Sequence, residues 1–411
     1  MQQKRVAMIS VHECPLASSE GKERGGINVY VYELSKALSR LGWYVDAYTR
    51  VQDDINPRIV SVNDYFRVIH IPSGPHTPLS KVDILKRLPE FTSNMLEYIQ
   101  KEHIVYTAIH SHYYLSGLVG KTLRKSLRIP VVMTFHTLGL MKELVSQSKD
   151  TGDPIERIPL ERDLAHTLNH FVTSSNADKE YLMTLYDCPE AKISIIPPGV
   201  DTKLFRPMNK QAAKKYIHAD IDHHIILAVG RMDPVKGFDV LLFALKTLLQ
   251  RNPSLSDHVC LWIVGGDIEQ QKDQWSKELQ KLDVLRIELG LTTTVRFVPP
   301  QPQEALPYYY NAADVLVMPS HYESFGMVAL EALSCGTPVI TTDVTGISSI
   351  LKESNQGRIV SANNPLTLAT ELQNVLFVSQ PKIDQKTLET YDWNTIAKKM
   401  ADMYTTLSIK E

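Results

Sequence analysis

The chain has 411 residues, of which 43% are hydrophobic and 22% are charged, and its formal net charge is −2. These values are ordinary for a globular protein of about two domains, and they exclude a general attraction to nucleic acid or anionic lipid. No stretch approaches 18 consecutive apolar residues, so no membrane-spanning helix is predicted.

The cysteines and the start of the chain indicate a reducing compartment. The four cysteines are scattered, with no spacing that suggests a zinc site or a disulfide framework: Cys14, Cys188, Cys260 and Cys335. The first residues, MQQKR, lead directly into an apolar strand pattern, so no signal peptide is expected. A cytoplasmic location is therefore predicted.

Strand and helix patterns alternate from the beginning. The apolar run Val6–Val11 predicts a strand, and a helix follows from about Val29 to Arg40. Helical patterns such as Phe91–Glu102 and Leu118–Leu127 separate further strand-like runs, which lie at Val45–Thr49, Val68–Ile71, Thr107–Ile109, Pro130–Phe135 and Phe171–Thr173. This alternation is typical of βαβ units and predicts a parallel sheet with helices on both faces.

The stretch Ile195–Pro207 interrupts this rhythm, because Pro197, Pro198 and Pro207 favour an extended connection between domains. A second α/β series follows. Its predicted strands are Ile225–Gly230, Val259–Val264, Val295–Val298, Asp314–Met318 and Pro338–Thr342, and its predicted helices are Gly237–Gln250, Pro365–Phe377 and Trp393–Leu407.

We therefore predict an α/β fold of two Rossmann-like, doubly wound parallel-sheet domains. The first covers residues 1–197, the linker 198–207 and the second 208–391, and the last helix lies within 392–411. Such sheets bind ligands at the carboxyl ends of their strands, so ligands are expected in a cleft that both domains face.

One stretch, Pro319–Thr342, carries a predicted anion site. A helix begins near Phe325–Gly326 after a buried strand, and its first turn holds no acid. The unpaired N–H groups of such a helix start bind phosphate. Two acids, Glu323 and Glu331, frame the site, and neutral sugar hydroxyls would suit both carboxylates. The alternative is a helix N-terminal acid at Glu323 and an exposed helix residue at Glu331.

A pair of cations follows the first strand of the second series, in the loop GRMDPVKG. Arg231 and Lys236 flank a proline turn at a strand's carboxyl end, where they would clamp a diphosphate and stabilise it as it leaves. Solvated surface residues are the alternative. In the first series Gly26 would allow a close backbone approach, and His136 ends a strand that faces the predicted cleft. No GxGxxG follows the first strand, which argues against a dinucleotide-dependent oxidoreductase.

Four separated motifs in this order resemble the family-4 retaining glycosyltransferases of GT-B fold. They are GRMDPVKG, ESFGMVALEALSCGTPVITT, the linker PPGVD and the late helix YDWNTIAKKMADMY. The resemblance implies that the final helix crosses back to the first domain. It also implies a metal-independent transfer from a nucleotide-diphosphate sugar, with no cofactor beyond that co-substrate, which is expected to be UDP-glucose or UDP-N-acetylglucosamine.

Within that family the first domain is most similar to enzymes that glycosylate phosphorylated acceptors. These are the mycothiol-pathway N-acetylglucosaminyltransferases, which use inositol 1-phosphate, and more distantly the sucrose-phosphate synthases. The stretches GGINVYVYEL, HSHYYLSG and TFHTLGLMK carry the likeness. It implies that Lys81, Tyr113, Thr137 and Arg157 hold the acceptor phosphate and that Asn28 contacts the inositol ring. Pairing of Arg157 with Glu156 or Glu161 on a helix face is the alternative.

For the donor, the resemblance implies that Arg231 and Lys236 neutralise the diphosphate and that Gly26 lets the backbone approach it. Glu331 would bind the ribose, Glu323 a hydroxyl of the donor sugar, and His136 the 6-hydroxyl region or the acceptor. Backbone amides would hold the phosphate and sugar at Phe325, Gly326, Met327 and Val328. No carboxylate stands ready as a covalent nucleophile, so front-face substitution is the predicted mechanism.

Several questions stay open at this point. The preferred interpretation is that the acceptor is an inositol phosphate or a sugar phosphate. The alternative is a lipid-linked acceptor in the synthesis of a polysaccharide or glycolipid. For that alternative, the basic segment Lys121–Arg128 would give peripheral membrane contact at most. A UDP-sugar 2-epimerase of the same fold is the alternative from another class. No nucleic-acid partner is expected, and the oligomeric state stays open, with a homodimer as one option.

Overall fold

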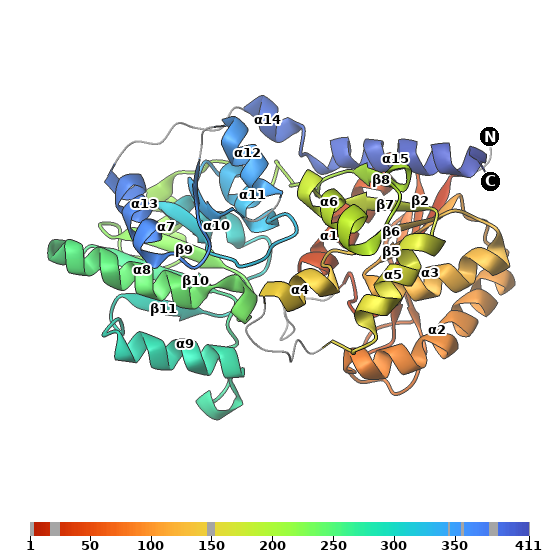
Figure 1. Cartoon of the computed structure of the whole chain (residues 1–411), viewed down its shortest axis with the longest axis horizontal. Helices are drawn as coiled ribbons and strands as arrows, with labels where there is room; N and C mark the ends of the chain where they lie inside the picture. The colour runs from red at the N-terminus through yellow and green to blue at the C-terminus, as the bar shows by residue number, and fades with distance from the viewer. Residues whose placement is uncertain are drawn as a thin grey trace. The chain divides into compact units, whose positions relative to one another are not determined.

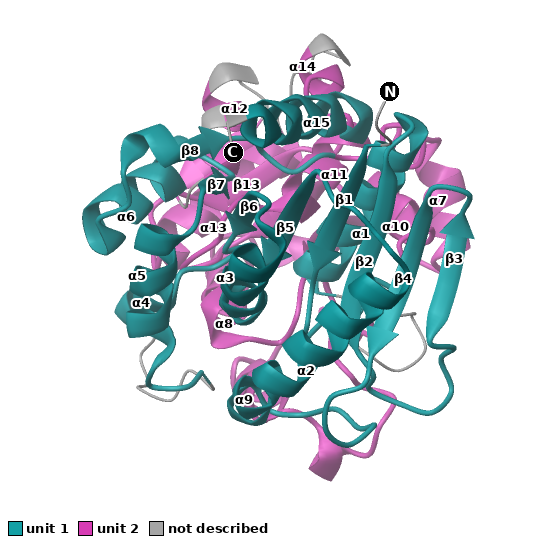
Figure 2. Cartoon of the chain, turned by 90° about the vertical axis from the view of Figure 1, so that its right-hand side faces the viewer, with its two compact units in different colours: residues 1–17, 24–199, 393–411 teal, residues 18–23, 200–392 magenta. Residues whose placement is uncertain are grey.

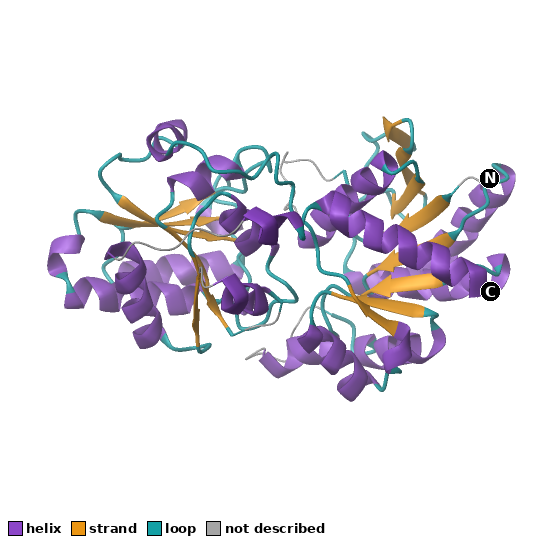
Figure 3. Ribbon diagram, turned by 90° about the horizontal axis from the view of Figure 1, so that it is seen from above, coloured by secondary structure: helices purple, strands orange, loops and turns teal. Residues whose placement is uncertain are grey.

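The computed structural model describes residues 4–16, 25–145, 153–343, 346–354, 357–377 and 385–410 (Figure 1). The chain divides into two compact units, coloured teal and magenta in Figure 2. Unit 1 contains Arg24–Gly199 and Trp393–Glu411, and unit 2 contains Val200–Asp392. Each unit has a sheet of strands between layers of helices (Figure 3).

In the described part of unit 1, eight strands form one sheet in the order β3-β4-β2-β1-β5-β6-β7-β8. The strands are β1 (Arg5–Ile9), β2 (Tyr44–Arg50), β3 (Ile59–Asn63), β4 (Phe66–Ile71), β5 (Ala108–His112), β6 (Val131–Thr134), β7 (His170–Thr173) and β8 (Ile193–Ile195). Pairing is parallel except at β3, an edge strand that pairs antiparallel with β4. The direction of strand addition reverses between β1 and β5, which makes that point the expected ligand position.

Helices cover both faces of this sheet. They are α1 (Gly26–Arg40), α2 (Lys81–Lys101), α3 (Tyr114–Leu127), α4 (Gly139–Val145), α5 (Arg157–Thr167), α6 (Asn176–Tyr186) and α15 (Trp393–Lys410). The described strand residues of β1, β5 and β6 are almost all buried, as expected when helices pack on both sides of a parallel sheet.

The predicted return of the last helix to the first part of the chain is confirmed. Helix α15 packs against α1 as part of unit 1 (Figure 2). Its Trp393 contacts Tyr30 edge to face, with ring centroids 5.4 Å apart. Its Tyr404 is fully buried, and the hydroxyl lies 2.6 Å from Nδ1 of His110 on β5.

Unit 2 is a second parallel sheet, in which six strands of the described residues follow the order β11-β10-β9-β12-β13-β14. They are β9 (His224–Val229), β10 (Val259–Val264), β11 (Val295–Val298), β12 (Val315–Met318), β13 (Val339–Thr342) and β14 (Gly357–Val360). Here the order reverses between β9 and β12.

Two apolar cores lie on the two faces of this sheet. One packs α8 (Phe238–Arg251), α9 (Lys277–Glu288) and α13 (Pro365–Phe377) on the strands. The other packs the remaining helices of unit 2, which are α7 (Lys210–Tyr216), α10 (Leu306–Ala312), α11 (Met327–Ser334), α12 (Ile347–Ser354) and α14 (Gln385–Glu389). This is the doubly wound arrangement that the sequence predicted.

The sequence placed the starts of three helices too late, since α1 begins at Gly26, α3 at Tyr114 and α2, with the largest difference, at Lys81. Helix α2 begins at Lys81 rather than at Phe91, because Ser80 caps it by accepting a hydrogen bond from the N–H of Asp83. Pro89 lies inside this helix, where proline normally argues for a boundary. As a result Lys81 lies on the first turn of a helix. No helix in the described part of the chain combines the length and apolar character that crossing a membrane requires.

Candidate active site

The predicted cations and acids of unit 2 meet at the point where its strand order reverses. Arg231 follows β9, and Lys236 ends the short 3-10 turn Pro234–Lys236 that leads into α8. Glu323 and Phe325 follow β12, the strand beside β9. Ligands of open α/β sheets bind outside the strand ends at such a point. Residues far apart in the sequence thus form one candidate half-site.

A direct contact between two loops sets their spacing. The backbone N–H of His321 donates to the carbonyl of Val235 at 2.8 Å. Gly237 has φ +64°, and a Cβ added there would lie 2.3 Å from the carbonyl oxygen of Pro319. Only glycine allows both this left-handed backbone and this close approach.

Within this half-site Lys236 forms an ion pair with Glu323. The Nζ of Lys236 lies 2.5 Å from Oε2 of Glu323, and each side chain is about one fifth exposed. Arg231 is exposed and has no ion-pair partner among the described residues. The half-site therefore presents one unpaired guanidinium beside an ion pair, which suits a ligand that has both a diphosphate and hydroxyl groups.

The start of α11 has the features expected of an anion site. Gly326 precedes the helix with φ +95°, no side chain caps it, and its first turn contains no acid. Ala329 and Leu330 donate to the carbonyl of Gly326. The N–H groups of Met327 and Val328 have no acceptor within the described residues, as is usual at a helix start.

Glu331 is buried in α11, so its alternative interpretation as an exposed helix residue is wrong. The hydroxyl of Tyr310 donates to its Oε2 at 2.6 Å. Burial, and next the Glu331 carboxylate, raises the pKa of Tyr310 well above its usual value, so the phenol stays a proton donor. Tyr310 therefore orients Glu331. No local pattern distinguishes Tyr310 from its neighbours in the run Tyr308–Tyr310.

In unit 1, Gly26 and Asn28 lie on the first turn of α1. Gly26 is exposed as the first residue of the helix, and Asn28 is buried on its first turn. The Nδ2 of Asn28 donates to the carbonyl of Cys14 at 3.1 Å, whereas its buried Oδ1 has no partner in the described part of the chain. A buried amide oxygen without a donor is available to a ligand hydroxyl.

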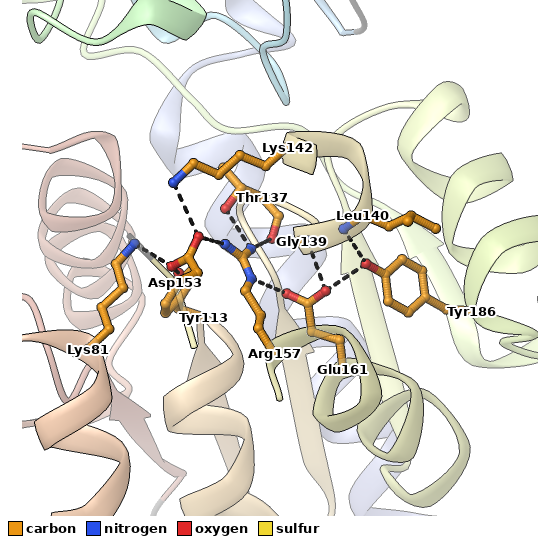
Figure 4. A network of polar contacts seen from close by, with 10 residues as sticks. All are labelled: Lys81, Tyr113, Thr137, Gly139, Leu140, Lys142, Asp153, Arg157, Glu161 and Tyr186. Carbon is orange, nitrogen blue, oxygen red and sulfur yellow. Dashed lines mark hydrogen bonds and ion pairs between the residues drawn. The ribbon is translucent and has the colours of Figure 1, made fainter. Parts of the chain in front are cut away.

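The predicted phosphate ligands do converge, and they converge on a carboxylate (Figure 4). One oxygen of Asp153, Oδ1, lies 2.6 Å from Nζ of Lys81 and accepts from the hydroxyl of Tyr113 at 3.0 Å. The other, Oδ2, lies 3.2 Å from Nζ of Lys142 and 2.7 Å from Nη1 of Arg157. We call Lys81, Lys142, Arg157 and the Tyr113 hydroxyl the cation cluster.

Arg157 is the centre of this cluster. It is buried, and its Nη2 donates to both the carbonyl and the hydroxyl oxygen of Thr137, at 2.7 and 3.1 Å. Its Nε donates to Glu161 at 2.7 Å, so the helical pairing considered as an alternative is present together with the predicted convergence. Tyr186 and the N–H of Gly139 in turn donate to the other oxygen of Glu161.

The charged groups around Asp153 shift one another's pKa values. Burial alone would raise the pKa of Asp153, but Arg157, Lys81 and Lys142 together lower it well below its usual value. Burial lowers the pKa of Lys81, which Asp153 partly offsets. Tyr113 has φ +73°, an unusual conformation for a tyrosine that is typical of functional sites.

His136 also has a left-handed backbone, with φ +62° just after β6. Its Nε2 lies 3.0 Å from Nδ1 of His112 at the end of β5. Burial lowers the pKa of His136 to about 3 and that of His112 well below its usual value, so both rings are neutral near pH 7. His136 therefore offers a neutral hydrogen bond, and the sequence did not indicate its partner.

The basic segment Lys121–Arg128 uses two of its cations within unit 1. Lys121 forms an ion pair with Asp163, and Arg124 donates to the carbonyl of Thr167 at 2.7 Å. Among the described residues, no group of three acids, histidines or cysteines is arranged to hold a metal ion.

Comparison with known proteins identifies the class of this molecule. The model for Glycosyltransferase Family 4 matches residues 24–204, and the model for glycosyl transferases group 1 matches residues 209–385. D-inositol 3-phosphate glycosyltransferase 2 of Catenulispora acidiphila is 34% identical over 98% of this chain and 94% of its own. The D-inositol 3-phosphate glycosyltransferase of Corynebacterium jeikeium is 35% identical over 90% of this chain and 87% of its own.

Solved structures of other proteins share the fold of this chain. Sucrose-phosphate synthase from Thermosynechococcus elongatus has a TM-score of 0.88 at 30% identity, with both chains fully covered. Anabaena HepE in complex with UDP and glucose shares the fold, with a TM-score of 0.73 at 17% identity over 98% of this chain and 100% of its own.

Two doubly wound units with a returning C-terminal helix define a GT-B protein. The chain belongs to glycosyltransferase family 4. It is therefore a retaining hexosyltransferase that uses a nucleotide-sugar donor.

Proposed function

We propose that this enzyme transfers glucose or N-acetylglucosamine from a uridine diphosphate sugar to a hydroxyl of a small phosphorylated acceptor. An inositol phosphate or a sugar phosphate is the expected acceptor. The convergence of the cation cluster on one buried anion carries this proposal. Relatives of more than 30% identity are named for transfer to D-inositol 3-phosphate, which supports the same class of acceptor.

The cluster suits a phosphate monoester because it offers charge together with directed donors. Lys81 and Arg157 supply cations, and the hydroxyls of Tyr113 and Thr137 supply neutral hydrogen bonds. These groups match the three terminal oxygens of a phosphate, which are strong acceptors. The unpaired Oδ1 of Asn28 would accept a hydroxyl of the acceptor ring.

For the donor, Arg231 and Lys236 would bind the diphosphate together with the amides of Met327 and Val328. Glu331, oriented by Tyr310, would accept the ribose hydroxyls, and Glu323 a hydroxyl of the transferred sugar. The exposed first residue of α1, Gly26, would lie against the diphosphate, and the neutral ring of His136 would bind near the 6-hydroxyl.

The mechanism that fits these groups is front-face substitution. The acceptor oxygen forms its bond to the anomeric carbon on the face from which the diphosphate departs. The departing phosphate oxygen takes the proton of the acceptor hydroxyl. Catalysis then depends on stabilising the charge of the leaving group, the role given to Arg231 and Lys236, and on positioning.

Release of free UDP tests the proposal. UDP-glucose and UDP-N-acetylglucosamine are each combined with inositol 1-phosphate, fructose 6-phosphate and the same acceptors without phosphate. We expect turnover with at least one phosphorylated acceptor and its loss when the phosphate is removed. Lys81→Met should raise KM for that acceptor by roughly 10- to 100-fold, as expected for one lost charged hydrogen bond.

Lys86→Met is the matched control, since Lys86 lies on the same helix and is exposed. Equal turnover with phosphorylated and unphosphorylated acceptors would contradict the proposal. Conversion of the UDP-sugar into its 2-epimer without an acceptor would favour an epimerase, and activity that needs a membrane fraction would favour a lipid-linked acceptor.

A further inference from the structure

We propose that Asp153 is a built-in competitor for the acceptor's phosphate, which sets how tightly an anion must bind to occupy the cation cluster, and that Lys142 is a further ligand of that phosphate. This inference rests on the proposed function, because it takes the cluster as the acceptor's phosphate site.

The first support is the saturation of Asp153. Its two oxygens contact four donors, two at each oxygen, and its side chain is 5% exposed. A carboxylate has about four lone-pair positions, so each is in use. A phosphate that takes these same four contacts would displace Asp153, because the single proton of the Tyr113 hydroxyl cannot be donated to both anions. Binding of the phosphate in this position is therefore an exchange of one anion for the other.

The second support is the way the partners are held. Lys81 and Arg157 begin α2 and α5, Lys142 lies on α4, and Tyr113 caps α3. Asp153 lies outside any helix or strand, in a bend that precedes Pro154. The cations and the phenol therefore belong to helices or to a helix cap, whereas Asp153 belongs to neither a helix nor a strand.

The third support is the charge balance. Among the described residues, Lys81, Lys142 and Arg157 face the carboxylates of Asp153 and Glu161, so these five groups together carry one net positive charge. A phosphate dianion added beside Asp153 would make the buried cluster net negative. A dianion that replaces Asp153 makes it neutral. A monoanion that replaces Asp153 gains nothing, because it exchanges one unit of charge for another.

The exchange therefore sets a threshold for binding. An anion that displaces Asp153 gains attraction only if its charge is greater than that of a carboxylate. Phosphate monoesters carry nearly two negative charges above their second pKa of about 6, whereas sulfate monoesters and carboxylates carry one. Displacement of Asp153 costs each anion the same free energy, so without Asp153 the cluster should bind both kinds of anion more tightly by a similar factor.

The test is calorimetric titration of the full chain, saturated with UDP, with methyl phosphate and methyl sulfate at pH 8. Wild type should prefer methyl phosphate. Asp153→Asn should bind methyl phosphate roughly tenfold more tightly, as for one charged contact released, and methyl sulfate more tightly by a similar factor. Asp163→Asn is the matched control, since Asp163 of α5 pairs with Lys121 of α3 rather than with the cluster, and it should behave as wild type.

Thermal unfolding supplies a second readout. Without Asp153 three cations lie close together with one carboxylate fewer, so Asp153→Asn should unfold at a lower temperature than wild type. Methyl phosphate should then raise its midpoint by more than it raises that of wild type. Lys142→Met should weaken binding of methyl phosphate roughly tenfold or more.

Each outcome is decisive. Equal or weaker binding of methyl phosphate by Asp153→Asn would show that Asp153 assists the phosphate and would overturn the inference alone, provided that Lys81→Met still raises KM for the phosphorylated acceptor. No effect of Lys142→Met would remove Lys142 from the site. Absence of methyl phosphate binding by every variant, with turnover indifferent to the acceptor phosphate, would overturn the proposed function as well.

Discussion

At the scale of single residues, the two cations of the candidate half-site in unit 2 differ in their ion pairing. Lys236 is paired with Glu323, whereas Arg231 is exposed and has no ion pair within the described residues. Removal of Lys236 would therefore also leave the Glu323 carboxylate without its cation, next to where a diphosphate is proposed to bind. Removal of Arg231 changes one charge only, which makes it the cleaner probe of leaving-group stabilisation.

Arg231→Ala should lower kcat by roughly 10²–10³-fold, the usual effect of removing one donor that stabilises transition-state charge. Thermal unfolding should be unchanged, since the side chain is exposed. Steady-state UDP release and a melting curve measure the two effects. Arg251→Ala, another exposed arginine of unit 2, is the control and should leave turnover unchanged. Turnover near that of wild type in Arg231→Ala would remove Arg231 from the mechanism.

At the scale of elements, the candidate donor site depends on the contact between the β9–α8 and β12–α11 loops. The bond from His321 to Val235 and the missing side chain at Gly237 hold these loops together. Lys236 and Glu323 lie next to these contacts, one on each loop. Misplacement by about 1 Å at such a site can cost roughly 10²-fold in rate.

Gly237→Ala should therefore lower both stability and activity. At φ +64° an alanine costs about 1–2 kcal/mol. Its Cβ would in addition lie 2.3 Å from the carbonyl oxygen of Pro319, so the loops must separate. Urea unfolding and UDP release should show a loss of stability and a fall in kcat of roughly 10²-fold.

Gly290→Ala separates backbone strain from loop displacement. Gly290 has φ +68°, but the nearest atom to an added Cβ is Nζ of Lys246 at 3.9 Å. The Gly290→Ala variant should lose a similar amount of stability through backbone strain and keep its kcat. Equal kcat in both alanine variants would contradict the role given to the loop contact.

The sequence indicated the parts of the fold and of the site that depend on neighbouring residues. Alternating apolar runs predicted both sheets, and the proline turn before Lys236 and the helix start after Phe325 are local patterns. The structure places these groups at strand ends, as parallel sheets require. Their roles in binding stay predictions.

What the sequence missed depends on contacts between distant residues. Asp153 and Lys142 contact each other, and Asp153 contacts Lys81, which lies 72 residues earlier in the chain. Tyr310 and His112 are likewise defined by the side chains they meet, Glu331 and His136. No local pattern marks such residues, because only the packing of elements creates their surroundings.

At the scale of the whole molecule, the two units differ in their buried histidines. Among the described residues, the histidines with a lowered pKa all belong to unit 1: His70, His110, His112 and His136. His110 joins three elements, because its ring contacts Thr134 on β6 and Tyr404 on α15. Burial is the main cause of each shift, so the native fold of unit 1 requires these rings to be neutral.

This difference predicts that acid destabilises unit 1 first. A histidine whose pKa falls from about 6.5 to about 3 on folding contributes its full stability above pH 6.5, and that contribution is lost as the pH falls towards 3. The free energy of unfolding should fall by roughly 1.4 kcal/mol per pH unit for each such histidine. Half-buried Asp314 of unit 2 has a lowered pKa instead, so its contribution is lost only below about pH 4.

Scanning calorimetry between pH 7.5 and pH 5 should therefore show the transition of unit 1 moving to lower temperature while that of unit 2 stays nearly constant. Gly290→Ala identifies the second transition, because it should lower only the unfolding temperature of unit 2. Parallel movement of both transitions, or none between pH 7 and pH 5, would contradict the assignment. If the prediction holds, loss of activity on mild acidification has a structural cause in unit 1, where His136 and the cation cluster lie.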